Sequence, residues 1–116
     1  MTTASLSNQL LAFLGTYVPT LDELGVLSAL IEEEGRWWNA ATMARVVGIP
    51  PSRARHILDT YAASNLLDIG ISDDVRYRLR PGNAMLEQSL REFSIAYRST
   101  PQLVRNWVSS GVRHRE

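Results

Sequence analysis

The sequence has 116 residues, of which 45% are hydrophobic and 21% are charged, so it is long enough for one globular domain and too apolar for a disordered chain. It contains no cysteine, which excludes disulfides and thiolate zinc sites, and it has no apolar run long enough to span a membrane. Its 12 basic residues, all arginine, balance 12 acidic ones. We therefore expect a cytoplasmic protein of a single domain, residues 1–116, from a bacterium with a GC-rich genome.

The charges are segregated along the chain although their sum is zero. Residues 35–58 hold four arginines and no acid, and residues 75–86 hold three arginines and no acid. Two acid-free basic blocks predict a positive face of the kind that binds nucleic acid. Charge blocks that are merely solvated by chance are the alternative.

Two helices are predicted in the first third of the chain. Apolar side chains at helical spacing mark the first, over 5–17, and Val18-Pro19 ends it. Thr20 and Glu23 have the spacing of a capping box, which would start the second helix, and Gly35 would end it.

A pair of helices joined by a tight turn is predicted next. Asn39 can cap a short helix over 40–47, and Gly48 ends it. Pro51 suits the first turn of a helix that extends to about Ser64, because that position needs no amide hydrogen.

Alternating apolar and polar residues then predict a β-hairpin over 67–80, followed by two helices that start near Asn83 and Pro101. Trp37 and Trp38 precede the helix pair. Because adjacent side chains of an extended segment face opposite ways, we expect one indole in the core beside a short third strand. The other is expected against a flanking helix or, less favoured, exposed as a partner contact.

Helix, short helix, turn, helix and hairpin follow one another in the order of a winged helix-turn-helix. Segments 44–49, 52–67 and 76–82 resemble the second helix and turn, the recognition helix, and the second wing strand of MarR-like winged-helix regulators. The resemblance covers roughly residues 20–82. It implies a mainly α, α+β domain with a two- or three-stranded wing sheet, and helical extensions over 1–19 and 83–116.

The resemblance implies that the partner is double-stranded DNA, with the helix over about 51–64 in the major groove and the hairpin beside the backbone. Pro50-Pro51 in place of a polar cap, and Asp73-Asp74 at the tip of the wing, depart from the family pattern. The wing arginines could instead pair with Asp68 across the hairpin. The expected DNA-binding residues are Ser52, Arg53, Arg55, His56, Thr60, Arg76, Arg78 and Arg80.

The flanking helices carry apolar stripes beyond what a winged helix needs, and a homodimer would cover them. A twofold dimer would also place two recognition helices about one DNA turn apart. The alternative is that both flanks fold back on their own domain. The expected interface residues are Leu6, Leu10, Phe13, Leu14, Leu86, Leu90, Phe93, Tyr97 and Trp107.

The sequence offers no constellation for catalysis or metal binding. His56 and His114 are far apart and lack carboxylates at ligand spacing, and there is no glycine-rich phosphate loop or nucleophile elbow. We therefore expect a transcription regulator without enzymatic activity, metal or cofactor. The rival hypothesis is a winged-helix dimerisation or adaptor module that binds protein and not DNA, because some methyltransferases carry a similar segment before their catalytic domain.

Overall fold

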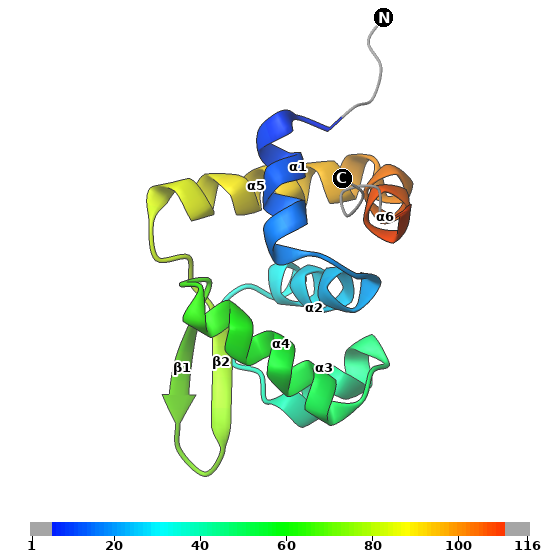
Figure 1. Ribbon diagram of the computed structural model, residues 1–116. Coiled ribbons are helices and arrows are strands. Elements are labelled where there is room, and N and C mark those ends of the chain that lie inside the picture. Colours follow the sequence, from blue (N-terminus) through cyan, green and yellow to red (C-terminus); the bar gives the residue numbers. More distant parts are fainter. Residues whose placement is uncertain (1–5, 111–116) are drawn as a thin grey trace, which may run out of the picture.

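The computed structural model describes residues 6–110, which form six helices with one antiparallel hairpin between the fourth and the fifth (Figure 1). The fold is therefore a mainly helical α+β domain, as predicted. The helices are α1 (Asn8–Tyr17), α2 (Leu21–Glu32), α3 (Ala40–Val47), α4 (Pro51–Ala63), α5 (Ala84–Ser99) and α6 (Pro101–Ser110), and the strands are β1 (Leu67–Ile71) and β2 (Val75–Leu79).

Short polar side chains start three of these helices. The Oδ1 atoms of Asn39 and Asn83 each accept the amide hydrogen three residues further on, at 2.8 and 2.9 Å, as the capping predictions require. The Oγ atom of Ser7 accepts from the amide of Leu10 at 3.1 Å, so α1 begins at Asn8. Residue 5, where the sequence pattern placed the start of this helix, lies outside the described residues.

The turn between α3 and α4 occupies residues 48–50. Gly48 ends α3 in the left-handed conformation, with φ of +84°, and its amide donates to the carbonyl of Ala44 at 2.8 Å. The amide of Ile49 donates to the same carbonyl at 3.1 Å, which seats the half-buried Ile49 under the turn. This tight connection holds α3 and α4 against each other.

Two glycine substitutions are expected to change stability in opposite directions. Gly48→Ala should lower the free energy of unfolding by about 1–2 kcal/mol, because a Cβ atom is strained at positive φ. Gly15→Ala, in the exposed face of α1, should raise it by about 0.5–1 kcal/mol, because alanine is the better helix former. Urea unfolding followed by circular dichroism measures both, and equal signs would contradict the left-handed turn.

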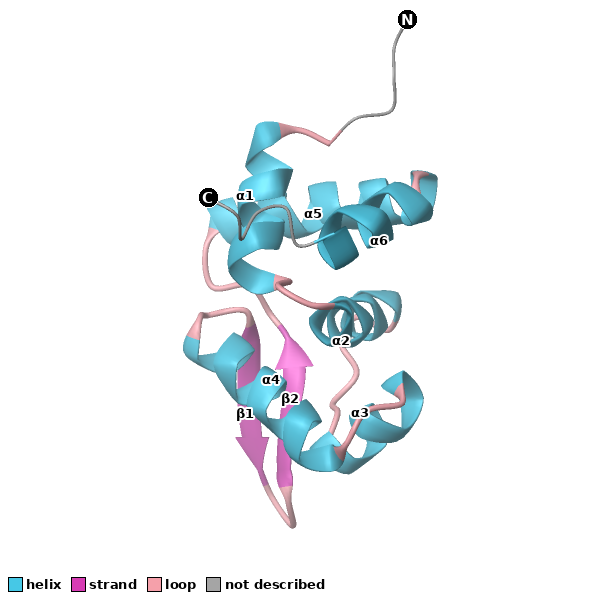
Figure 2. Ribbon diagram, turned by 45° about the vertical axis from the view of Figure 1, so that its right-hand side comes forward, coloured by secondary structure: helices cyan, strands magenta, loops and turns pink. Residues whose placement is uncertain are grey.

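The elements form two layers with α2 between them (Figures 1 and 2). One layer contains α1, α5 and α6, and the other contains α3, α4 and the hairpin; α2 contacts α6 on one side and α3, α4 and β2 on the other. The largest fully buried side chains come from both layers and include Trp38, Tyr61, Tyr77, Phe93, Leu14, Leu27, Met43 and Leu58.

None of the helices in the described part of the chain is by itself long and apolar enough to cross a membrane. Helices α1 and α2 reach that length and apolarity only when taken together, and the chain bends by 108° between them. Both helices place leucine and other apolar side chains in the core instead.

The two adjacent tryptophans lie in different environments, as predicted for an extended segment. Trp38 is 2% exposed and forms a single antiparallel bridge with Tyr77, with N–H···O distances of 2.7 Å in both directions. The expected third strand is thus reduced to one residue. Trp37 packs on the hairpin over Gly70 and Arg78, which corrects the expectation that it packs against a flanking helix.

The flanking helices pack against their own domain. The ring of Phe13 on α1 lies 6.3 Å from that of Phe93 on α5, and the ring of Phe93 stacks on Tyr97 at 5.7 Å. Helix α6 packs against α2 and α5. Five side chains that we expected in a dimer interface are buried inside the single chain, so they belong to its core: Leu10, Phe13, Leu14, Leu90 and Phe93. The other four, Leu6, Leu86, Tyr97 and Trp107, pack against that core and are half-buried.

Candidate nucleic-acid interface

Helix α4 is amphipathic, and its outer face is left uncovered by the described part of the chain. Its inner side chains Ala54, Ile57, Leu58 and Tyr61 are buried, as predicted. The outer face of α4 consists of Ser52, Arg55, His56, Asp59 and Thr60, all exposed. Because Pro51 is the first residue of the helix, these side chains start within its first turn.

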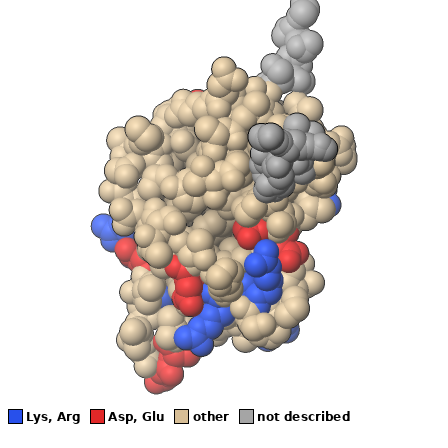
Figure 3. Space-filling model, viewed as in Figure 1, with Lys and Arg blue, Asp and Glu red and all other residues tan. Residues whose placement is uncertain are grey.

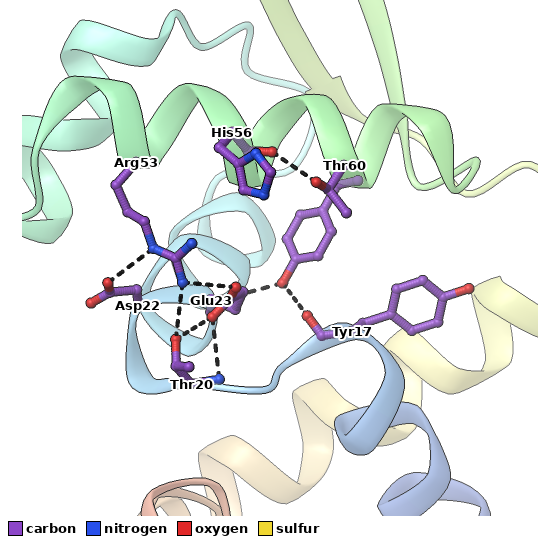
Figure 4. A network of polar contacts seen from close by, with 8 residues as sticks. Tyr17, Thr20, Asp22, Glu23, Arg53, His56 and Thr60 are labelled. Carbon is purple, nitrogen blue, oxygen red and sulfur yellow. Dashed lines mark hydrogen bonds and ion pairs between the residues drawn. The ribbon is translucent and has the colours of Figure 1, made fainter.

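Arg53 does not belong to this outer face, although the sequence analysis grouped it there. Its Nη2 atom lies 3.1 Å from Oε2 of Glu23, and its Nε atom lies 3.3 Å from Oδ2 of Asp22 (Figure 4). The side chain of Arg53 is 34% exposed, and that of Glu23 only 11%. Arg53 therefore binds α4 to the start of α2.

Glu23 accepts several hydrogen bonds at the same place. Its Oε1 atom accepts from the amide of Thr20 at 3.2 Å, as the predicted capping box requires, and the Thr20 hydroxyl also donates to it. Nearby, the hydroxyl of Tyr61 donates to the carbonyl of Tyr17 at 2.6 Å. Burial, and then the charge of Glu23, raise the pKa of Tyr61, which remains a neutral donor. These contacts fix α4 against α2 and the segment before it.

Arg55 is held much more loosely. Its Nε atom lies 3.7 Å from Oδ2 of Asp59 one turn along the helix, and more than half of each side chain is exposed. Exposed pairs of this spacing contribute at most a few tenths of a kcal/mol. Asp59 also accepts a hydrogen bond from the hydroxyl of Tyr77; burial and then this bond raise the pKa of Tyr77 to about 12. Because its ion pair with Asp59 is exposed and weak, the guanidinium of Arg55 can exchange this partner for another at little cost.

Two of the hairpin arginines share one carboxylate. Strand register places Asp68 opposite Arg78, and Oδ2 of Asp68 lies 3.1 Å from Arg78 and 3.3 Å from Arg80. The hydrogen bond from Arg78 is the main reason that the pKa of Asp68 lies below its usual value. Arg78 also lies over the indole of Trp37, at 4.4 Å from the ring centroid. The pairing with Asp68 that was left as an alternative is therefore present for Arg78 and Arg80, but not for Arg76, which pairs with Asp74.

The acidic tip of the hairpin is partly neutralised. Asp74 lies 2.9 Å from Nε of Arg76 and accepts from Nδ2 of Asn39 at 3.0 Å. These two hydrogen bonds, that of Arg76 first, lower the pKa of Asp74. Asp73 is exposed and has no ion pair within residues 6–110. It therefore carries the uncompensated charge at the tip.

Charged side chains gather in the half of the molecule that contains α4 and the hairpin, where basic and acidic groups lie next to each other (Figure 3). The opposite half is nearly free of charge in the same view. The basic blocks of the sequence are thus brought together in space, but each of the five predicted DNA-binding arginines has a carboxylate neighbour.

Of these carboxylates, only Asp68 was predicted as a partner of the arginines. Asp59 stands four residues after Arg55, which is a recognisable helical pair, so its role could have been predicted. The pairing of Arg53 with Asp22 and Glu23 spans about thirty residues, and only the packing of α4 on α2 brings it about. No sequence spacing indicates such a contact.

Residues 6–110 contain no group of three or more histidine, aspartate or glutamate side chains placed to hold a metal ion. The outer face of α4, with the hairpin arginines, is the candidate functional surface, because the polar side chains of that face are all exposed. No protein-family model, curated protein or solved structure matches the chain.

Proposed function

We propose that this protein is a winged helix-turn-helix regulator that binds double-stranded DNA, with α4 in the major groove and the hairpin beside the backbone. The observation that carries the proposal is the pairing of α3 and α4 through a three-residue turn, with the polar outer face of α4 left uncovered by residues 6–110. A hairpin follows α4 directly, in the position of a wing.

Arg55 is the residue proposed to read base edges, with Ser52, His56 and Thr60 beside it. A guanidinium on the first turns of a recognition helix can bind guanine with two hydrogen bonds. The ion pair between Arg55 and Asp59 is weak, so it opposes binding of Arg55 to guanine only slightly. Arg53, in contrast, is a positioning residue, because its guanidinium is already committed to α2.

The hairpin arginines are proposed to contact phosphate. Arg76 and Arg80 have side chains that are 48% and 67% exposed, so a phosphate could replace their carboxylate partners with little loss. Arg78 is held by both Asp68 and Trp37 and is expected to contribute less.

The proposal includes a homodimer, because two recognition helices read a twofold site more tightly than one. The buried residues of α1 and α5 cannot supply its contacts. The large apolar side chains that stay exposed on α5 are Met85 and Ile95, and they are the proposed centre of the interface.

An adaptor module that binds protein is the second candidate. Its support is the carboxylate partner beside every predicted DNA-binding arginine, which lowers the positive potential of the face. Ile69 and Ile71 of β1 and Val46 of α3 are also exposed on this layer. Exposed aliphatic side chains suit a protein surface better than a phosphate backbone.

Selection of duplexes from a random pool, followed by fluorescence anisotropy, tests the proposal. Arg55→Ala should weaken binding to the selected duplex by about 1–3 kcal/mol and binding to random DNA far less. Arg91→Ala is the matched control, because Arg91 forms a pair of the same spacing with Glu87 on α5. Equal effects of the two substitutions, or no enriched duplex, would leave the adaptor function standing.

Removal of the uncompensated tip charge should strengthen DNA binding. Asp73→Asn keeps the size of the side chain and removes a charge that repels phosphate. The gain should appear at low salt and shrink as salt is raised, since exposed charges are screened. Glu32→Gln, in the other exposed acidic segment at the end of α2, is the control and should leave affinity unchanged. An equal gain for both variants would mean that only net charge matters.

A further inference from the structure

The outer edge of β1 is open. Strand β2 pairs with β1 on one side and with Trp38 on the other, whereas no strand within residues 6–110 pairs with the far side of β1 (Figure 1). Proline, lysine and strand-breaking bulges are the usual protection of an exposed edge. Strand β1 contains neither proline nor lysine, and its one charged side chain, Asp68, is already held by Arg78 and Arg80. The edge is therefore available to another strand.

The register of the hairpin shows which backbone groups lie on this edge. The amide of Arg80 donates to the carbonyl of Leu66 at 2.8 Å, and such pairs recur at every second residue of an antiparallel ladder. The even-numbered residues of β1 therefore bond to β2, and the N–H and C=O groups of Ile69 and Ile71 point away from it. The side chains of these two residues are also 51% and 80% exposed. A row of free donors and acceptors beside apolar side chains fits an extended strand.

The exposed part of β1, Ile69-Gly70-Ile71, reads the same in both directions. When a second copy pairs antiparallel about Gly70, Ile69 faces Ile71 of the partner subunit, and the same pair recurs across the twofold axis. Each of these isoleucines then both donates and accepts a hydrogen bond, and facing β-branched side chains stabilise a sheet. Pairing about Ile69 would instead need the edge of Leu67, which is only 6% exposed.

The other face of the edge requires a small residue between the two isoleucines. A Cβ atom on Gly70 would lie 3.0 Å from the ring of Trp37, so this ring already occupies the space above the glycine. Glycine on the facing strand brings no side chain against the ring. In the same register Asp68 faces Ser72 of the partner subunit, so no two carboxylates oppose each other. Both faces of β1 thus fit a second β1.

We propose that β1 pairs antiparallel with β1 of a second copy, about a twofold axis at Gly70, to form one continuous sheet from both hairpins. Arg76 and Arg78 project from the face opposite to the isoleucines, so the pairing does not use them and does not depend on DNA binding. It is also separate from the proposed contact through Met85 and Ile95, because α5 belongs to the other layer (Figure 1). A chain that uses both contacts would assemble beyond a dimer.

Disulfide trapping tests the register, because the chain has no cysteine of its own. Ile69→Cys labelled with ¹⁵N is mixed with unlabelled Ile71→Cys and oxidised mildly, and mass spectrometry distinguishes mixed from like disulfides. Facing residues have Cα atoms about 5.5 Å apart, which suits a disulfide, whereas two copies of residue 69 lie diagonally, about 7–8 Å apart. Mixed disulfides should therefore exceed like ones at least about fivefold. Equal amounts, as random collision gives, or no linked chains would overturn the proposal.

Two lysine substitutions separate the edge of β1 from other exposed apolar positions. Ile71→Lys places a charge on the edge and should weaken self-association at least about tenfold. Val46→Lys, at a position of α3 that is 59% exposed in the same layer, is the matched control and should leave self-association unchanged. Sedimentation velocity measures both in a chain that also carries Met85→Lys and Ile95→Lys, so that α5 does not contribute. A background chain that stays monomeric, or equal association of the two variants, would overturn the proposal.

Discussion

Phe93→Ala is expected to lower the free energy of unfolding by about 3–5 kcal/mol, the usual cost of truncating a buried aromatic side chain. Phe93 is 0% exposed and packs between Phe13 and Tyr97. The substitution therefore removes the contact that joins α1 to α5. Urea unfolding followed by circular dichroism gives the change in free energy.

Glu87→Gln is the control on the same helix, because the side chain of Glu87 is 61% exposed and the substitution removes only an exposed ion pair with Arg91. It should change the free energy of unfolding by no more than about 0.5 kcal/mol. Since Phe93 is buried within one chain, its loss should cost the same at every protein concentration. A loss of unfolding free energy that depends on protein concentration would mean that Phe93 lies in a dimer interface.

Local sequence signals were sufficient for the elements of the fold. Capping residues such as Asn39 and Asn83, the left-handed Gly48 and the alternation in the hairpin act within a few residues, so spacing alone reveals them. What covers an apolar stripe is a different question. The stripes of α1 and α5 look the same in sequence whether a second copy or their own domain buries them, and here each buries the other.

The candidate site was less predictable for the same reason. Exposure of Arg55 and His56 follows from the helical period, because their neighbours Ala54 and Ile57 turn inward. Whether the guanidinium of an arginine is paired or available depends on which carboxylates the fold places near it. Arg53 and Arg55 stand two residues apart, and one is bound to α2 while the other lies in solvent.

The second large expected effect is on stability, and it follows from this difference between Arg53 and Arg55. Arg53→Ala should lower the free energy of unfolding by about 1–3 kcal/mol, because it leaves the buried carboxylate of Glu23 without its cation. The cost falls below that of a fully buried pair because the side chain of Arg53 is 34% exposed. Arg55→Ala breaks only an exposed pair and should cost at most about 0.5 kcal/mol.

The two variants should exchange their order when DNA binding is measured instead of stability. Folded Arg53→Ala retains the outer face of α4, so its affinity for a selected duplex should fall less than that of Arg55→Ala. The comparison is made below the unfolding transition of both variants, so that only native protein is titrated. Should Arg53→Ala lose more affinity than Arg55→Ala while remaining as stable as the unmodified chain, Arg53 would leave α2 to contact the DNA itself. The ion pairs with Asp22 and Glu23 would then hold Arg53 only in the protein without DNA.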